Sequence, residues 1–229
     1  MRPDQAEFLL SFLLPQLKSE QMITKKIASA VPADNCEYKP DAKSRSAFGL
    51  AWHLAVVEVW FLDAVIHRHF GETAARPPEV KTCRDVALRY EENTALRMPL
   101  LERLSGEDLA TPIDFIGLRN DSAVAYLNIA IRHSVHHRGQ LSTYLRPMGA
   151  KVPAIYVESA DEPYPLSPGT DARKASNGRL RSDGSGVVSR LARPISGGTA
   201  DVPSNTSSWR PLRVVRDAEI VLLQSAAVD

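Results

Sequence analysis

Two histidines near the middle of the chain, His133 and His137, are spaced to share a metal ion. They lie four residues apart in the run Ile131–Gln140, which has the composition of a helix. A helix turns by about 100° per residue, so this spacing stacks both imidazoles on one face, one turn apart. Such a pair can bind a single divalent ion, which then needs at least one further ligand.

His53 is the strongest candidate for the third ligand. It lies in the apolar stretch Leu50–Val57, where neighbours at helical spacing form a core-facing stripe. A histidine on such a stripe is shielded from water, and a facing helix of a bundle can supply a metal ligand. The alternative is a buried core histidine that binds no metal, and helices also carry pairs such as His133 and His137 without metal. Spacing alone leaves both interpretations open.

The pattern disfavours two known kinds of metal site. A zincin protease carries H-E-x-x-H, in which the glutamate after the first histidine is the general base, whereas Ser134 follows His133 here. A di-iron carboxylate bundle carries Glu-x-x-His on two helices, and Glu58 and Glu91 do not have that spacing. A mononuclear site with only histidine ligands fits better.

Three polar side chains are candidates for lining the pocket or for hydrogen-bonding to the ligands. Gln140 and Tyr144 lie three and seven positions after His137. Tyr126 lies seven positions before His133. All are close to the same helical face. Packing in the core with a buried polar tip is the alternative role. His136 is a rival ligand, because its spacing is also compatible with one face.

Four helical patterns must position these side chains. Apolar residues recur at helical spacing over about residues 4–30, 44–70, 82–104 and 120–148. Residues that favour helix N-caps stand near three of the starts, namely Ser44 or Ser46, Thr82, and Asn120, Asp121 or Ser122. No strand pattern competes up to residue 150. The sequence therefore predicts an all-α fold, a four-helix bundle.

The composition changes after Pro163. Residues 165–208 are rich in Ser, Gly, Pro, Asn and Arg and poor in large apolar side chains. Such a segment cannot bury enough surface to offset its chain entropy. We therefore expect one domain over residues 1–163, followed by a low-complexity, disordered tail over residues 164–229.

Composition also limits the classes of function. The net charge of +1 over 229 residues gives no strong attraction to nucleic acid or to an anionic membrane. The N-terminus has no long apolar run and no cleavage pattern, so we expect a cytoplasmic protein. Cys36 and Cys83 form no C-x-x-C motif, so neither a disulfide framework nor a thiolate metal site is indicated.

The histidine segments resemble the signature of the DinB family, also called DinB/YfiT-like. The resemblance covers about residues 4–163, and Trp52–Ala55 resembles the first histidine motif of the family. The other matching segments are Tyr126–Asn128, His133–Leu141, Tyr144–Arg146, Met148–Gly149, Val152–Pro153 and Ser159–Pro163.

The resemblance implies a four-helix bundle that binds one divalent ion, zinc or nickel in many members, through three histidines. Carried over by position, the ligands are His53, His133 and His137, so the resemblance favours His137 over His136. Family members are commonly homodimers, and they include transferases and isomerases that use low-molecular-weight thiols. Three imidazoles would also accept iron or copper.

Three neutral imidazoles leave the charge of a divalent ion uncompensated, so a bound water or thiol should lose its proton easily. We therefore expect a metal-dependent transferase of the thiol S-transferase type, or a hydrolase, acting on a small molecule such as a low-molecular-weight thiol. The alternatives are a non-catalytic metal-binding or stress-related protein, and a helical interaction module whose histidines are structural.

Overall fold

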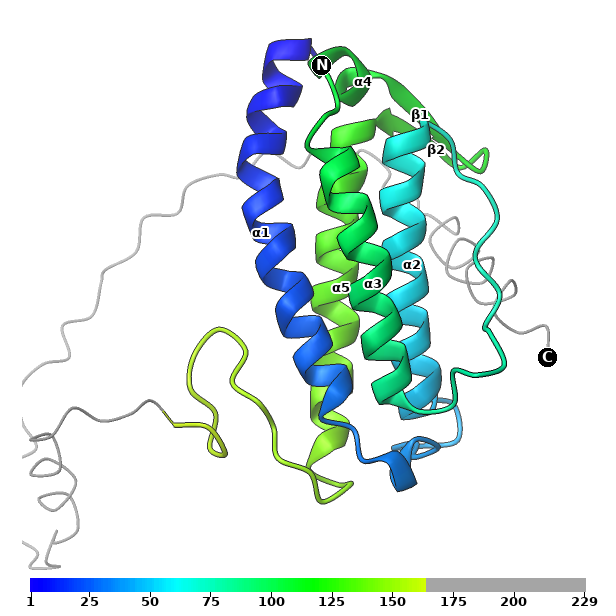
Figure 1. Ribbon diagram of the computed structural model, residues 1–229, viewed down its shortest axis with the longest axis vertical. Coiled ribbons are helices and arrows are strands. Elements are labelled where there is room, and N and C mark those ends of the chain that lie inside the picture. Colours follow the sequence, from blue (N-terminus) through cyan, green and yellow to red (C-terminus); the bar gives the residue numbers. More distant parts are fainter. Residues whose placement is uncertain (164–229) are drawn as a thin grey trace, which may run out of the picture. The chain divides into compact units, whose positions relative to one another are not determined.

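Four long helices make up most of the computed structural model, which describes residues 1–163 (Figure 1). They are α1 (Pro3–Ser29), α2 (Ala47–His67), α3 (Cys83–Leu101) and α5 (Ala123–Leu145). The expected all-α fold is confirmed, and each long helix lies close to its predicted range. The predicted tail, residues 164–229, lies outside the described residues.

Local capping explains where α2 and α3 begin. The Ser46 hydroxyl accepts a hydrogen bond from the backbone of the first turn of α2. Thr82 and Asp85 form a reciprocal capping box at the start of α3. At its other end, α2 stops at His67 rather than near Phe70, because Arg68 adopts a left-handed backbone with φ of 60°.

The connection between α2 and α3 runs back along α2, so these two helices start at the same end of the bundle (Figure 1). Gly71 accepts a 2.6 Å hydrogen bond from the Trp60 indole, and further along the loop the Arg76 guanidinium lies 5.1 Å from the Phe48 ring, in the first turn of α2. α5 runs antiparallel to α2 and packs against it. The face of α2 that carries His53 therefore meets the face of α5 that carries the histidine pair.

The connector between α3 and α5 is more ordered than the sequence predicts. It contains a short helix and a hairpin, namely α4 (Gly106–Ala110), β1 (Pro112–Phe115) and β2 (Arg119–Ser122). Elsewhere, a short 3-10 helix follows α1 over Ala33–Asn35. The strands pair antiparallel, so the expectation of a strand-free region up to residue 150 is wrong. Only Ile113 is fully buried in the two strands, at 1% exposure, so no alternating pattern marks them in the sequence.

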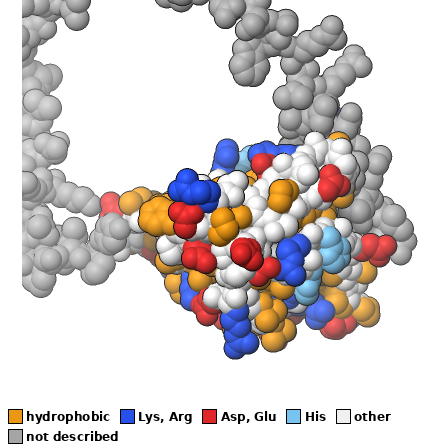
Figure 2. All heavy atoms as spheres, turned by 90° about the horizontal axis from the view of Figure 1, so that it is seen from above, with side chains coloured by type: hydrophobic (Ala, Val, Ile, Leu, Met, Phe, Trp, Pro, Cys, Tyr) orange, Lys and Arg blue, Asp and Glu red, His pale blue; other side chains and the backbone are white. Residues whose placement is uncertain are grey.

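α2 is the most apolar of the described helices. Among the described helices it alone is long and apolar enough to cross a bilayer, but 72% of that apolar window is buried inside the protein. Its apolar surface is thus covered by α3 and α5, as in a core helix. The end of the bundle seen in Figure 2 carries acidic and basic side chains close together, in keeping with the net charge of +1.

Candidate metal centre

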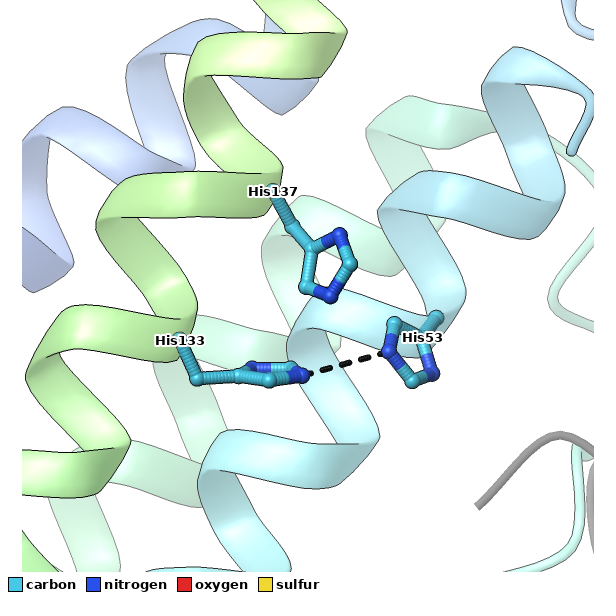
Figure 3. A group of neighbouring side chains, drawn as sticks. All are labelled: His53, His133 and His137. Atoms are coloured by element: carbon cyan, nitrogen blue, oxygen red, sulfur yellow. Dashed lines mark hydrogen bonds between the residues drawn. The ribbon is translucent and has the colours of Figure 1, made fainter. Parts of the chain in front are cut away.

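Three histidines converge between α2 and α5 (Figure 3). His53 projects from the second turn of α2, and His133 and His137 project from successive turns of α5. The Nε2 atoms of His53 and His133 are 3.2 Å apart, and one ring nitrogen from each of the three residues lies within 4.8 Å of the others. The structure thus brings together the three residues named from the sequence.

These distances fit a single ion with small adjustments. Imidazole nitrogens bound tetrahedrally to zinc lie about 2.0–2.1 Å from the metal, which places them about 3.3 Å apart. The separation between His53 and His133 is close to that value, and the 4.8 Å spread of the whole group is wider. The three histidines could therefore hold one ion after a small movement of their side chains.

Burial keeps two of the imidazoles neutral. Desolvation lowers the pKa of His53 from 6.5 to about 3, with further contributions from the charges of Arg45 and His137. Desolvation, followed by the neighbouring His137 and His53, lowers the pKa of His133 from 6.5 to about 2. A neutral imidazole has the free lone pair that a metal ligand needs, so these histidines are ready to bind an ion at neutral pH.

Gln140 sets the tautomer of His137. The Nδ1 atom of His137 lies 2.7 Å from the amide oxygen Oε1 of Gln140, one turn further along α5. An amide oxygen only accepts hydrogen bonds, so Nδ1 carries the proton and Nε2 has the lone pair. Of the roles considered for Gln140 from the sequence, this contact is a hydrogen bond to a candidate ligand.

The histidines open into a pocket of about 420 Å³. Its walls come from the segment before α2, from α2 itself and from α5. Besides the three histidines, it is lined by Lys43, Ser44, Arg45, Leu50, His136, Gln140 and Tyr144. Gln140 and Tyr144 thus lie at the same pocket as the histidines, and a small molecule could reach the imidazoles.

A family-wide sequence comparison matches residues 10–169 to the DinB family, which is more than half of the chain. The chain belongs to the DinB family. The same stretch contains all three converging histidines, as the resemblance of the histidine segments implied.

Two relatives of this DinB protein come from Bacillus subtilis. It is 30% identical over 134 residues to the uncharacterized protein YjoA, a match that covers 57% of the chain and 85% of YjoA. It is 24% identical over 156 residues to the uncharacterized protein YrdA, covering 67% of the chain and 91% of YrdA. These matches support the family and leave the activity to be argued from the site.

Solved structures of DinB-like proteins share the fold. The structure of YjoA from Bacillus subtilis superposes with a TM-score of 0.54 at 26% identity, over 62% of this chain and 96% of that one. A DinB-like protein from Bacillus cereus gives a TM-score of 0.55 at 22% identity, over 63% and 95% of the two chains. Both superpositions therefore span nearly the whole of the relatives.

The structure places Tyr126 in the alternative position named from the sequence, packed in the core with a buried polar tip. Its ring is buried, and its hydroxyl donates to the carbonyl of Ile113 in β1 at 3.0 Å, so the side chain supports the hairpin rather than lining the pocket. The helical spacing was right, but seven residues along α5 moves Tyr126 two turns away from the histidines. His136, the rival ligand, is exposed and lines the pocket outside the group of three.

A buried network beside the site was not recognised from the sequence. Glu58 of α2 is fully buried and accepts hydrogen bonds from Gln21 of α1 at 3.0 Å, from Tyr90 of α3 at 2.8 Å and from Ser134 of α5. Burial raises the pKa of its carboxyl group, opposed by these hydrogen bonds. The network fixes all four long helices relative to one another. One of its members, Ser134, directly follows His133 in the sequence. A lone glutamate in the apolar run of α2 was the available signal.

Arg45 was also missed. It stands at the predicted start of the second helix, between the two candidate caps Ser44 and Ser46, where the sequence does not indicate which way its side chain points. In the structure it lines the histidine pocket, and its charge acts on both His53 and His133.

Proposed function

We propose that this DinB-family chain binds one divalent metal ion through His53, His133 and His137 and is a transferase of the thiol S-transferase type. The observation that carries the proposal is the convergence of three imidazoles from two facing helices, two of them kept neutral by burial, at the base of an open pocket. Three imidazoles suit zinc, nickel, iron or copper, and the resemblance to the DinB family favours zinc or nickel among them.

When bound, a divalent ion held by three neutral ligands supplies a positive charge that lowers the pKa of a coordinated thiol or water. The protein's own residues prepare the place for it. Gln140 orients the His137 ring through its Nδ1 proton, and the buried surroundings of His53 strengthen electrostatic interactions in the pocket. Arg45 adds a positive charge on the side of the pocket formed by the segment before α2.

A thiol is favoured over water as the nucleophile because the described pocket lining contains no carboxylate. Metal-dependent hydrolases such as the zincins use a glutamate to take a proton from water. A thiol has a pKa near 8.5 and ionises without such a base when a positive charge is close. Hydrolysis of a small molecule is the second candidate, with exposed His136 as the nearest group able to accept a proton.

We further propose that the protein acts in the cytoplasm as a homodimer, on a small molecule rather than on nucleic acid or a membrane. The mixed surface charge and the burial of the apolar helix α2 support a small-molecule substrate over nucleic acid or a membrane. Light scattering of the purified chain should give the mass of two chains, and a mass of one chain would contradict the homodimer.

Metal analysis of protein purified without a histidine tag tests the metal site. The wild type should hold about one equivalent of zinc or nickel after loading and desalting, and His53→Ala, His133→Ala and His137→Ala should each weaken binding by about 100-fold or more. His136→Ala is the matched control, since it removes an imidazole from the same pocket. Equal loss in His136→Ala, or no metal in the wild type, would contradict the assignment.

A conjugation assay tests the activity. The metal-loaded wild type is mixed with an aromatic electrophile and a panel of cellular thiols, and product is followed by absorbance. We expect a thiol-dependent rate that disappears after metal removal and in His53→Ala. A stoichiometric metal content with no rate above His53→Ala would instead favour a non-catalytic metal-binding protein, and absence of metal would favour structural histidines.

A further inference from the structure

One positive charge in the histidine pocket has no partner. Arg45 is half-buried, and its Nη2 atom is buried with no hydrogen-bond partner among the described residues. Leaving a buried guanidinium nitrogen without an acceptor costs free energy, so such groups are normally paired. Because Arg45 lines the histidine pocket, an acceptor that enters the pocket could pair with this guanidinium after a small movement of the side chain.

The rest of the pocket does not neutralise this charge. Lys43 and Arg45 line the pocket, and the described lining contains neither Asp nor Glu. Burial lowers the pKa of Arg45, but the pKa of a guanidinium is ordinarily so high that the group stays charged at neutral pH. The pocket thus presents a net positive charge even before any ion is added.

The backbone around Arg45 is held in place from several sides. The Asp41 carboxylate accepts hydrogen bonds from the Lys43 amide at 2.8 Å, the Ser44 amide at 3.1 Å and the Ser44 hydroxyl at 2.5 Å. On the other side, the Tyr144 hydroxyl of α5 donates to the Arg45 carbonyl at 3.5 Å. A side chain on such a fixed backbone loses less entropy when it binds a ligand.

We infer that the substrate carries an anionic oxygen group, a carboxylate or a phosphate, and that Arg45 binds this group while the reacting end lies at the three histidines. The inference rests on the proposed function, since it assigns a second attachment point for the same small molecule. A guanidinium donates two parallel N–H bonds to such groups. Lys43 is exposed, so water and salt weaken its contribution.

Calorimetry with a matched set of thiols tests this inference on the zinc-loaded protein. The probes are 3-mercapto-1-propanol, 3-mercaptopropionate and 3-mercaptopropyl phosphate, which share a thiol and differ in the other end. The wild type should bind at least one of the anionic probes about 10-fold or more tightly than the neutral one. The probe with the larger preference shows whether the group is a carboxylate or a phosphate.

Variants assign the preference to Arg45. Arg45→Gln should bind the three thiols about equally, Arg45→Lys should keep part of the preference, and Arg84→Gln should match the wild type. Arg84 is an exposed residue of α3, so its replacement makes the same change in net charge outside the pocket. Thermal unfolding confirms that each variant is folded. An anionic preference that persists unchanged in Arg45→Gln, or that is absent from the wild type, overturns the inference.

A metal-free arm separates this inference from the proposed function. Propionate or inorganic phosphate is added to the metal-free protein while the arginine side-chain signals are followed by NMR. The signal that is missing in Arg45→Gln should shift in the wild type. If zinc fails to bind but this signal shifts, the proposed function fails and the anion site stands. If zinc binds and neither the shift nor the thiol preference is seen, only the anion site fails.

Discussion

Single residues give the candidate centre its chemistry through their protonation states. His53 is 5% exposed and its pKa is lowered to about 3, and the pKa of His133 is lowered to about 2, so both offer lone pairs at neutral pH. His137 is held by a different means, a hydrogen bond from its Nδ1 to Gln140. Burial thus keeps His53 and His133 neutral, and the amide of Gln140 orients His137.

Gln140→Leu should weaken zinc binding about 10-fold, because the His137 ring loses the acceptor that fixes its tautomer and orientation. Competition with a coloured chelator measures the affinity. Thr143→Ala is the control on the same helix, since the Thr143 hydroxyl is exposed and donates only to a carbonyl of its own helix. An affinity for zinc that is the same in Gln140→Leu and Thr143→Ala would show that Gln140 does not position His137.

The metal-free protein should lose stability as the pH falls below about 6.5. In that range the unfolded chain protonates its histidines, whereas His53 and His133 in the folded chain stay neutral until about pH 3 and pH 2. Extra protons bound by the unfolded chain favour unfolding. Glu58 acts in the opposite direction, because its raised pKa lets the folded chain keep a proton that the unfolded chain releases above about pH 4.5.

Urea unfolding at pH 7.5 and pH 5.0 measures this effect. The urea concentration at the unfolding midpoint of the wild type should be lower at pH 5.0 than at pH 7.5. In the double variant His53→Gln and His133→Gln, this midpoint should decrease less between the two pH values. If the midpoint decreases equally in the double variant and the wild type, the two histidines are not the source of the pH dependence.

At the scale of the elements, one carboxylate joins the four long helices. Glu58 of α2 accepts hydrogen bonds from Gln21, Tyr90 and Ser134, one residue on each of the other three helices. Arg138, one turn further along α5, is also buried and pairs with Glu20 of α1 at 2.5 Å. These polar contacts set the register of α5 against α1 and α2, and hence the distance between the histidines.

Glu58→Ala should lower the free energy of unfolding by about 3 kcal/mol, because it leaves buried donors on three helices without their acceptor. Urea unfolding at pH 7.5 measures the change. Glu91→Ala is the comparison, since Glu91 forms an exposed ion pair between α3 and Lys25 of α1 at 2.6 Å and should change stability by only about 0.5 kcal/mol. Equal effects of the two substitutions would refute the role given to Glu58.

The helices and the three histidines could be predicted from the sequence because both depend on local spacing. Caps such as Ser46 and Thr82 mark helix starts within a few residues, and the pair at positions 133 and 137 shares a face in any helix. The resemblance to the DinB family then placed His53 in the same group.

The features missed from the sequence depend on contacts between distant segments. The hairpin has one fully buried strand residue, Ile113, and is supported by Tyr126 of α5. Arg45 reaches the pocket because of a turn organised by Asp41, and Glu58 has partners on three other helices. A periodic pattern along one segment contains no information about such contacts.

For the whole molecule, residues 1–163 should form a complete folding unit. The segment after α5 is tied to the bundle by Lys26 and Glu162 at 2.5 Å and by Arg146 and Asp161 at 3.1 Å. A chain ending at Pro163 should therefore melt within a few degrees of the full chain and bind zinc equally well. Calorimetric melting and zinc titration of both chains check this.

A chain ending at Ala150 is the matched comparison, because it loses both ion pairs of the final segment. It should melt at a lower temperature than the chain ending at Pro163. Failure of the chain ending at Pro163 to fold would mean that residues beyond it are needed, contrary to the predicted domain boundary.

The X-ray absorption spectrum of the zinc-loaded wild type tests the three-histidine centre directly. We expect one zinc ion with three imidazole ligands at about 2.0–2.1 Å and the remaining coordination filled by oxygen or nitrogen. His137→Ala should reduce the imidazole count, and His136→Ala should leave it at three. Sulfur at about 2.3 Å in the absence of added thiol, or fewer than three imidazoles in the wild type, would contradict a centre formed by His53, His133 and His137.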